Sequence, residues 1–419
     1  MLPAGLLPFA VVFVERHHRP KETRVHPLIP QALCGGLLWL AACSAEPSLQ
    51  ATPAATNAAT VNTLAPTAAD APAEPQPHSQ PLGSSPIARL ALGSCIRQNK
   101  PAPIWDAVLA YRPEVFLLLG DNVYADTRDP QEMLKTYAAL DGQEGFQRLR
   151  ASSRLLAVWD DHDYGENDAG AEYPMKAQSQ RMFCDFFGVP ADSRRRSQAG
   201  NYDAVTLGPP GRRVQFILLD TRSFRSPLAK NPKGKPAQRG PYAPSEDPAQ
   251  SVLGDEQWRW LEAQLREPAQ WRLIASSIQF ASTEHGWETW GQFPRERRRL
   301  LEVIRRTRAG GVVIFSGDRH KAEVSRIPAG EHGLEYPLHD LTASSMNQPG
   351  AGALGEPNPH RILGEDQYTQ ANFGTVDFDW SGAEPAIRLA IRDARGAEVK
   401  ALRLTLGDLT PPAGGTPGR

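Results

Sequence analysis

Short apolar runs that each end in a polar cluster recur along this chain of 419 residues. The runs have the length of buried strands and cover 87–92, 115–119, 155–158, 273–275 and 312–315. The clusters that follow them are Gly93-Ser94-Cys95, Gly120-Asp121-Asn122-Val123-Tyr124, Trp159-Asp160-Asp161-His162-Asp163, Ser276-Ser277-Ile278-Gln279 and Gly317-Asp318-Arg319-His320. Open α/β sheets place their ligands outside the carboxyl ends of such strands. The pattern therefore predicts that side chains far apart in the sequence meet at one edge.

The residue types in these clusters favour a metal site. Tyr124 follows Asp121 at i+3, so a tight turn can direct both side chains to one centre. A phenol becomes a useful ligand when a cation removes its proton, and Cys95 would bind in the same way as a thiolate. The alternatives are an ordinary half-buried tyrosine and a cysteine that packs as a small apolar residue.

The run Asp160-Asp161-His162-Asp163 is the most specific cluster. Three carboxylates around one histidine repel one another unless a cation or solvent compensates their charge. An exposed acidic turn is the alternative. Asp318 and His320 are spaced so that alternate side chains can reach one pocket. Together the clusters predict a metal centre that carries out hydrolysis.

Charge and cysteine content narrow the possibilities further. The formal net charge of −1 gives no overall basic field for nucleic acid. The arginine clusters lie beside acids or on predicted helices, as solvated surfaces do. Of the four cysteines, Cys34 and Cys43 lie in a leader, which leaves Cys95 and Cys184 for the folded body. We expect no disulfide between these two, because Cys95 fits the metal site.

The N-terminal region has the composition of an export signal followed by a linker. Residues 32–42 are apolar, too short to span a bilayer and suited to a signal peptide. They end in Leu40-Ala41-Ala42-Cys43, which resembles a bacterial lipobox, so we expect a lipoprotein leader over 1–43. A chance run of small residues in a buried helix is the alternative. Residues 44–86 are rich in Ala, Pro and Thr and predict a disordered tether.

Residues 1–24 fit this leader poorly. A charged segment at 15–21 separates an apolar piece at 2–14 from the signal core. We therefore expect translation to begin near Val25, and peptides from residues 1–20 in the unprocessed precursor would contradict this.

The body over 87–407 alternates strand-like and helix-like segments, as an α/β fold does. The predicted helices are 103–111, 130–139, 176–187, 254–267 and 294–308. Further predicted strands are 202–207, 213–220, 375–380, 386–392 and 399–406, the last three with the alternation of half-buried antiparallel strands. We expect a long surface loop near the site at 226–247, rim loops at 284–287 and 344–347, and a disordered tail at 408–419.

The ordered clusters give the chain a family resemblance. Gly93-Ser94-Cys95, Gly120-Asp121-x-x-Tyr124, Trp159-Asp160-Asp161-His162-Asp163 and Gly317-Asp318-x-His320 resemble the PhoD-like alkaline phosphatases, a branch of the calcineurin-like metallophosphoesterases. The resemblance runs from about residue 88 to 405 and implies a four-layer αββα sandwich with antiparallel C-terminal strands. Larger PhoD-like enzymes carry an immunoglobulin-like domain before the catalytic one, whereas we expect only the tether before Ile87.

The resemblance also implies the cofactors, which are a ferric ion and one or more calcium ions, with other divalent metals as alternatives. The implied iron ligands are Cys95, Asp121, Tyr124 and His320. The implied calcium ligands are Asp121, Asp161 and Asp318. This division matches ligand hardness, because thiolate, phenolate and imidazole suit iron and carboxylates suit calcium.

The expected reaction is metal-dependent hydrolysis of phosphate mono- or diesters. His162 is the predicted general acid, and Asp163 or Asp160 is predicted to orient its ring, which makes Asp163 a second catalytic candidate.

The predicted substrate-binding residues are Asn167, Arg222 and Gln279. Arg222 follows a strand that ends at Asp220, and its guanidinium either holds a phosphate oxygen or pairs with Asp220. Gln279 stands where other phosphoesterases offer histidine, which gives it less weight.

Two other functions remain open from the sequence. One is phospholipase D-type cleavage of lipid head groups, which some relatives in the resemblance perform. The other is a lipid-anchored protein that binds metal or solute without catalysis, although His162 between acids is superfluous for binding alone. The expected partners are a phosphate ester and, through the anchor, a membrane, with no specific nucleic acid and no obligate protein partner. The expected location is the bacterial cell envelope, on the periplasmic side.

Overall fold

A computed structural model describes residues 85–232, 234, 239–350 and 355–412 of the chain. The chain divides into the units Met1–Ala71 and Pro72–Arg419, and all described residues belong to the second unit. The predicted leader, lipobox, translation start and nearly all of the tether lie outside the described residues.

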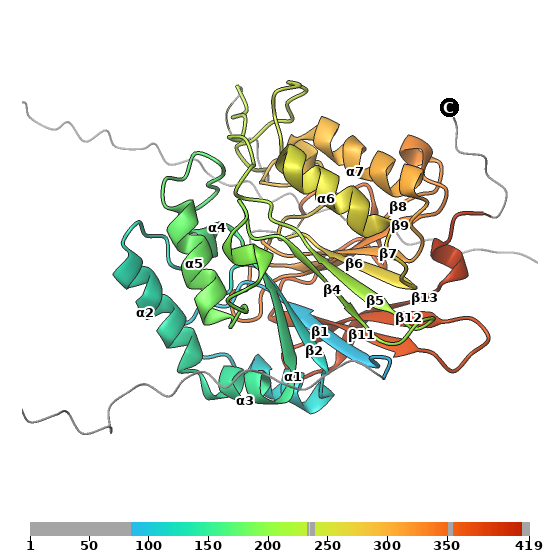
Figure 1. The fold of residues 1–419 in the computed structure, drawn as a ribbon, viewed down its shortest axis with the longest axis horizontal. Coiled ribbons are helices and arrows are strands. Elements are labelled where there is room, and N and C mark those ends of the chain that lie inside the picture. Colours follow the sequence, from blue (N-terminus) through green and yellow to red (C-terminus); the bar gives the residue numbers. More distant parts are fainter. Residues whose placement is uncertain (1–84, 233, 235–238, 351–354, 413–419) are drawn as a thin grey trace, which may run out of the picture. The chain divides into compact units, whose positions relative to one another are not determined.

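Two β-sheets pack face to face in the described domain (Figure 1). Sheet A has the order β13-β12-β11-β1-β2-β3. Its strands are β1 Arg89–Gly93, β2 Val115–Leu119, β3 Arg154–Val158, β11 Asn372–Asp379, β12 Ala386–Asp393 and β13 Glu398–Thr405. β1 to β3 are parallel to one another, and β11 to β13 form the predicted antiparallel C-terminal strands.

Sheet B has the order β10-β8-β9-β7-β6-β5-β4. Its strands are β4 Asp203–Leu207, β5 Val214–Leu218, β6 Trp271–Ala275, β7 Val312–Ser316, β8 Ala322–Ile327, β9 Leu338–Ala343 and β10 Arg361–Ile362. The central strands β5, β6, β7 and β9 are parallel. β6 and β7 are buried along their whole length, as strands covered on both faces are.

Side-chain alternation along sheet A separates two hydrophobic cores. Leu117 and Leu119 of β2 face the core that is shared with sheet B, whereas Phe116 and Leu118 face the core under the helices. Because successive strand residues point to opposite faces, one strand supplies both cores.

Helices cover the outer face of each sheet (Figure 1). The helices over sheet A are α1 Ile104–Tyr111, α2 Pro130–Asp141, α3 Glu144–Ser152 and α5 Lys176–Phe186, and those over sheet B are α6 Gly254–Leu265 and α7 Pro294–Thr307. A single-turn helix, α4 Asp161–Tyr164, follows β3. The predicted αββα arrangement is confirmed.

The sequence analysis missed α3, α4 and the strands β8 to β10. In β8 and β9 the polar residues Glu323, His339 and Asp340 are buried, which hides the apolar alternation that marks a strand. The chain also stays packed beyond residue 407, in the predicted tail, because Leu409 is buried and accepts a 2.7 Å hydrogen bond from the Gly311 N–H.

Two further findings concern the described residues alone. No helix among them is both long and apolar enough to cross a bilayer. Cys95 and Cys184 are both buried free thiols.

Candidate metal centre

The carboxyl ends of parallel strands from both sheets bring the predicted clusters together. In sheet A, β1 leads into Cys95 and β2 into Asp121, while in sheet B β7 leads into His320 and β9 into Ser344. Cys95 Sγ lies 3.3 Å from Asp121 Oδ2 and 3.1 Å from Ser344 Oγ. Ser344 Oγ also accepts a 2.8 Å hydrogen bond from the His320 N–H. The predicted rim loop at 344–347 therefore begins inside the site.

The residues expected to hold iron form one group. Tyr124 Oη lies 2.9 Å from His320 Nε2 and donates a 3.2 Å hydrogen bond to Asp121 Oδ2. Ligand atoms of Cys95, Asp121 and His320 all lie within 4.8 Å of one another. The structure thus brings together all four of these side chains.

A second group adjoins the first through Asp121. Ligand atoms of Asp121, Asp161 and His162 lie within 4.8 Å of one another, and those of Asp161, Asp168 and Glu288 do the same. Asp161 accepts a 2.7 Å hydrogen bond from the Asp168 N–H. Asp121 is therefore shared by two groups that could each hold a cation. Among the described residues, Asp318 belongs to none of these groups.

The donor set fits a cation. Asp121 Oδ1 and Asp318 Oδ2 are buried and have no hydrogen-bond partner among the described residues. Burial raises the pKa of Cys95 to about 11 and raises the pKa values of Asp121 and Tyr124 well above their ordinary ranges. The protein alone therefore favours the protonated forms, whereas a bound cation favours the deprotonated ligands.

The backbone of the ligand loops is strained. The φ angle is 60° at Cys95, 50° at Asp121, 66° at Asp318 and 52° at His320. Few non-glycine residues adopt this left-handed region, and such conformations concentrate at functional sites where the surrounding fold enforces them. The backbone conformation of these loops therefore directs the four side chains toward the site.

Asp160 and Arg222 form a buried ion pair behind the centre. Arg222 Nε donates a 2.6 Å hydrogen bond to Asp160 Oδ1, and Arg222 Nη1 lies 2.7 Å from Glu288 Oε2. The Arg222 side chain is 0% exposed, so no atom of its guanidinium is open to a substrate. The prediction that Arg222 contacts the substrate is wrong. Its side chain pairs with Asp160 and Glu288 rather than with Asp220.

Asp163 caps the backbone. Its carboxylate accepts hydrogen bonds from the N–H groups of Asn122 at 3.0 Å, Val123 at 3.2 Å and Asp160 at 3.0 Å. The side chain is fully buried and completes a capping box at the start of α4. The prediction that Asp163 or Asp160 orients His162 is wrong, because both carboxylates have other partners.

His162 lies at the rim of the site with a different partner. His162 Nδ1 lies 2.6 Å from Asp126 Oδ1, and the ring packs on Tyr124 with 4.2 Å between centroids. Burial lowers the pKa of His162, but neighbouring carboxylates, chiefly Asp121 and Asp161, raise it to about 11. The sequence places Asp126 five residues after Asp121, in the same cluster, but its contact with His162 was not predicted.

The other two predicted substrate-binding residues have different environments. Asn167 is exposed and lies next to Asp168 in the chain. Gln279 is buried, and its Nε2 donates 2.8 Å hydrogen bonds to Glu323 Oε1 and Thr342 Oγ1. Gln279 is therefore part of the buried interior beside sheet B. The prediction that it contacts the substrate is wrong.

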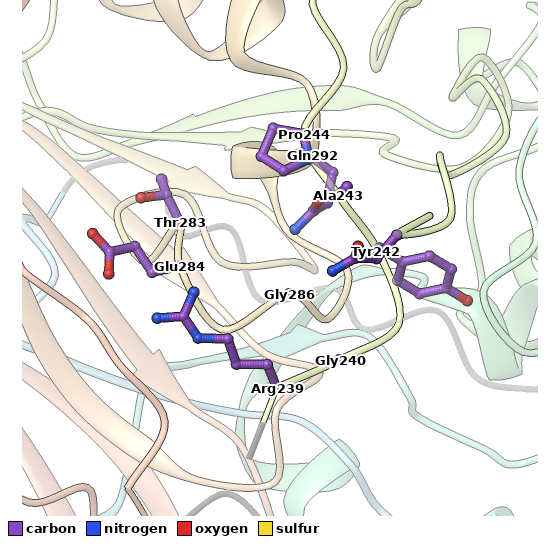
Figure 2. A pocket seen from close by; sticks show the side chains of 10 residues that line it. Arg239, Gly240, Tyr242, Ala243, Pro244, Thr283, Glu284, Gly286 and Gln292 are labelled. Carbon is purple, nitrogen blue, oxygen red and sulfur yellow. The ribbon is translucent and has the colours of Figure 1, made fainter. Parts of the chain in front are cut away.

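A cavity of about 240 Å³ lies next to the centre, between segments 239–244 and 283–292 (Figure 2). Tyr242 lines it and donates a hydrogen bond to Asp168, a member of the acidic groups. Figure 2 shows Tyr242 and Arg239 leaving their segment in different directions. Part of the predicted surface loop at 226–247 thus reaches the site.

Comparison with known proteins agrees with this geometry. The sequence profile of the PhoD-like phosphatases matches residues 90–379. Alkaline phosphatase D of Bacillus subtilis (strain 168) is 24% identical over 289 residues, which cover 63% of this chain and 49% of that protein. The solved structure of PhoD has a TM-score of 0.60 at 18% identity and covers 78% of this chain and 70% of that chain.

These matches differ in what they establish. The chain spans about half the length of the curated relative it matches. The likeness to the solved structure establishes the fold, whereas the family profile covers well over half of the chain. This chain belongs to the PhoD-like phosphatase family.

Proposed function

We propose that this chain is a metal-dependent phosphoesterase of the alkaline phosphatase D type that hydrolyses phosphate mono- or diesters. The observation that carries the proposal is the convergence of Cys95, Asp121 and His320 within 4.8 Å, with Asp121 shared by a second group. Membership of the PhoD-like phosphatases supports the same reaction.

Two kinds of ion suit the side chains around Asp121. Cys95, Asp121, Tyr124 and His320 would hold a ferric ion, and Asp121, Asp161 and Asp318 would hold calcium. Such ions supply the positive charge that stabilises a phosphoryl group under attack. Asp121 Oδ1 and Asp318 Oδ2, which accept no hydrogen bond from the described residues, support this assignment.

His162 is proposed to protonate the leaving alkoxide. Its Nδ1 is engaged by Asp126, which leaves Nε2 as the nitrogen that can serve a substrate. Tyr124 supports the face of the ring, and the His162 side chain is 15% exposed, so a substrate can reach it. Asn167 at the rim is proposed to contact the substrate.

The proposed location is the bacterial cell envelope, with a lipid anchor at Cys43. The motif Leu40-Ala41-Ala42-Cys43 and the Ala/Pro/Thr-rich segment after it support this proposal.

The function is tested on the purified full chain with iron and calcium supplied. We expect both metals in elemental analysis, a tyrosinate-to-iron absorption band, and turnover of chromogenic phosphate mono- or diesters. Phosphatidylcholine vesicles in parallel reveal phospholipase D-type cleavage. Absence of turnover on every ester would contradict the proposal and favour a binding protein.

The His162→Ala variant separates catalysis from metal binding. We expect it to retain both metals and to lose roughly 10²–10⁴ in turnover, the usual size of an acid–base contribution. His332→Asn is the control, because His332 is an exposed histidine with φ of 48° and asparagine tolerates that backbone. Undiminished turnover in His162→Ala would remove His162 from the mechanism.

A further inference from the structure

A second charged cavity lies on the helix-covered face of sheet A, beside α1. It has a volume of about 460 Å³, and its charged lining residues are Arg89, Arg112, Arg392, Arg395 and Asp377. Four guanidinium groups and one carboxylate give this lining a net charge of +3 (four minus one). The arginines come from β1, the end of α1 and the β12–β13 hairpin, so the fold gathers them from three places.

The acids near this cavity neutralise only part of its charge. Asp377 Oδ1 accepts a 2.8 Å hydrogen bond from Tyr111 Oη, and burial followed by Asp377 raises the pKa of Tyr111. From outside the lining, Glu398 lies 3.0 Å from Arg392 and Asp393 lies 3.6 Å from Arg395.

Arg89 and Arg112 form no ion pair with any acid in the described part of the chain. Positive charges held close together without a counterion repel one another. A bound anion would reduce this repulsion between the guanidinium groups.

Two of the arginines, Arg392 and Arg89, are held by hydrogen bonds. Arg392 Nε donates a 3.1 Å hydrogen bond to Thr375 Oγ1, Arg392 Nη1 donates one of 3.0 Å to the Gly396 carbonyl, and the guanidinium lies 5.2 Å from the Tyr111 ring centroid. Arg89 Nε donates a 3.0 Å hydrogen bond to the Arg112 carbonyl, which leaves the terminal nitrogens of Arg89 for another acceptor. The Tyr111 ring adds an apolar wall.

We propose that this cavity binds a phosphate group carried on a small organic body. Guanidinium groups match phosphate oxygens in a two-point geometry, and a volume of this size is typical of small-molecule sites. The apolar wall at Tyr111 would contact the organic part. The site is separate from the metal centre and does not depend on the proposed phosphoesterase activity.

Two sources of such a phosphate are a soluble organophosphate and the head group of an anionic lipid. The arginine lining suits the phosphate of either source, and the two arms of the test distinguish them.

The test uses the full chain with Cys43→Ser, so that no anchor is attached, and with EDTA, so that no metal centre binds phosphate. One arm titrates glycerol 3-phosphate by calorimetry, and the other measures sedimentation with phosphatidylcholine vesicles with and without phosphatidylglycerol. The variant is Arg89→Gln with Arg112→Asn, where asparagine suits the φ of 53° at position 112. The matched control is Arg388→Gln, which pairs with Glu398 on the same sheet and does not line the cavity.

We expect the double variant to weaken binding about tenfold or more, because two charge-assisted hydrogen bonds are lost. We expect the control to bind like the unsubstituted chain, and esterase turnover to be unchanged in both. Binding of glycerol 3-phosphate alone assigns a soluble ligand, and vesicle binding that requires phosphatidylglycerol assigns a lipid.

If the double variant unfolds, Arg395→Ser replaces it, because that side chain is 91% exposed, and it should also weaken binding. The absence of saturable binding in both arms, or equal weakening in Arg388→Gln, would overturn the proposal.

Discussion

The metal centre and the ion-pair network behind it both contain buried carboxylates, but Asp160 and Glu288 of the network pair with arginines, whereas Asp121 of the centre does not. Asp160 and Glu288 pair with Arg222, and Glu288 also pairs with Arg225 at 2.7 Å. Among the described residues, no lysine or arginine pairs with Asp121. The absence of a lysine or arginine partner, rather than the number of nearby acids, therefore distinguishes Asp121 from the carboxylates of the network.

This difference separates residues that are adjacent in the sequence. Asp160 joins the ion pair with Arg222, Asp161 joins both acidic groups, His162 lies at the rim, and Asp163 caps the backbone. Successive helical residues point about 100° apart, so the single turn of α4 distributes its side chains in different directions.

The largest expected effect follows removal of the shared carboxylate. Asp121→Asn should lose both ions and reduce turnover by about 10³-fold or more, since the charge that holds the metals is gone. Elemental analysis and ester turnover measure this loss. The free energy of unfolding of the metal-free chain should change by about 1 kcal/mol or less, because no lysine or arginine loses its partner. Retention of both metals would contradict the shared role of Asp121.

The opposite outcome is expected in the network. Asp160→Asn should lower the free energy of unfolding by about 3–5 kcal/mol, because the buried Arg222 guanidinium loses the negative charge of one of its partners. The folded fraction should keep its metals. Chemical denaturation with metal analysis of the folded protein checks both points, and a stable variant that lacks metal would reverse the assignment of Asp160 and Asp121.

A smaller effect is expected at the rim. Asp126→Asn should reduce turnover about 10–100-fold with metal content unchanged, because the His162 ring loses the partner that orients it. Asp129→Asn is the control, since Asp129 lies on the same loop but caps α2 through the Gln131 N–H. Steady-state kinetics should show a loss in kcat for Asp126→Asn alone. Equal losses in the two variants would point to a general disturbance of the loop.

The smallest effect is a pH dependence inside sheet B. Burial raises the pKa of Glu323, but Lys321 and Arg361 lower it to about 2. A carboxyl with a depressed folded-state pKa stabilises the protein above its unfolded value of about 4.5 and loses this effect as pH falls toward 2. The stability advantage over Glu323→Gln should shrink by about 1 kcal/mol per pH unit below about pH 4. Denaturation at several pH values measures it, and a constant difference would contradict the shift.

The sequence predicted which loops form the site better than it predicted what each side chain does. Apolar runs before Cys95, Asp121 and His320 locate strand ends, and strand ends meet at one edge because parallel strands share a direction. The partners of Arg222 and His162 depend on how the two sheets pack, and spacing along the chain carries no information about that. The same limit hid β8 and β9, because partners of their buried acids come from distant parts of the sequence: Arg361 pairs with Glu323, and the Phe280 N–H donates a hydrogen bond to Asp340.

The left-handed backbone at Asp121 and Asp318 also shapes how the gene can change. Asparagine is the other common side chain that this conformation accepts with little strain. One base separates the aspartate codons from those of asparagine. A single-base substitution can thus remove a negative charge without changing the conformation of the loop. A descendant of this chain could therefore lose metal binding in one step and remain well folded.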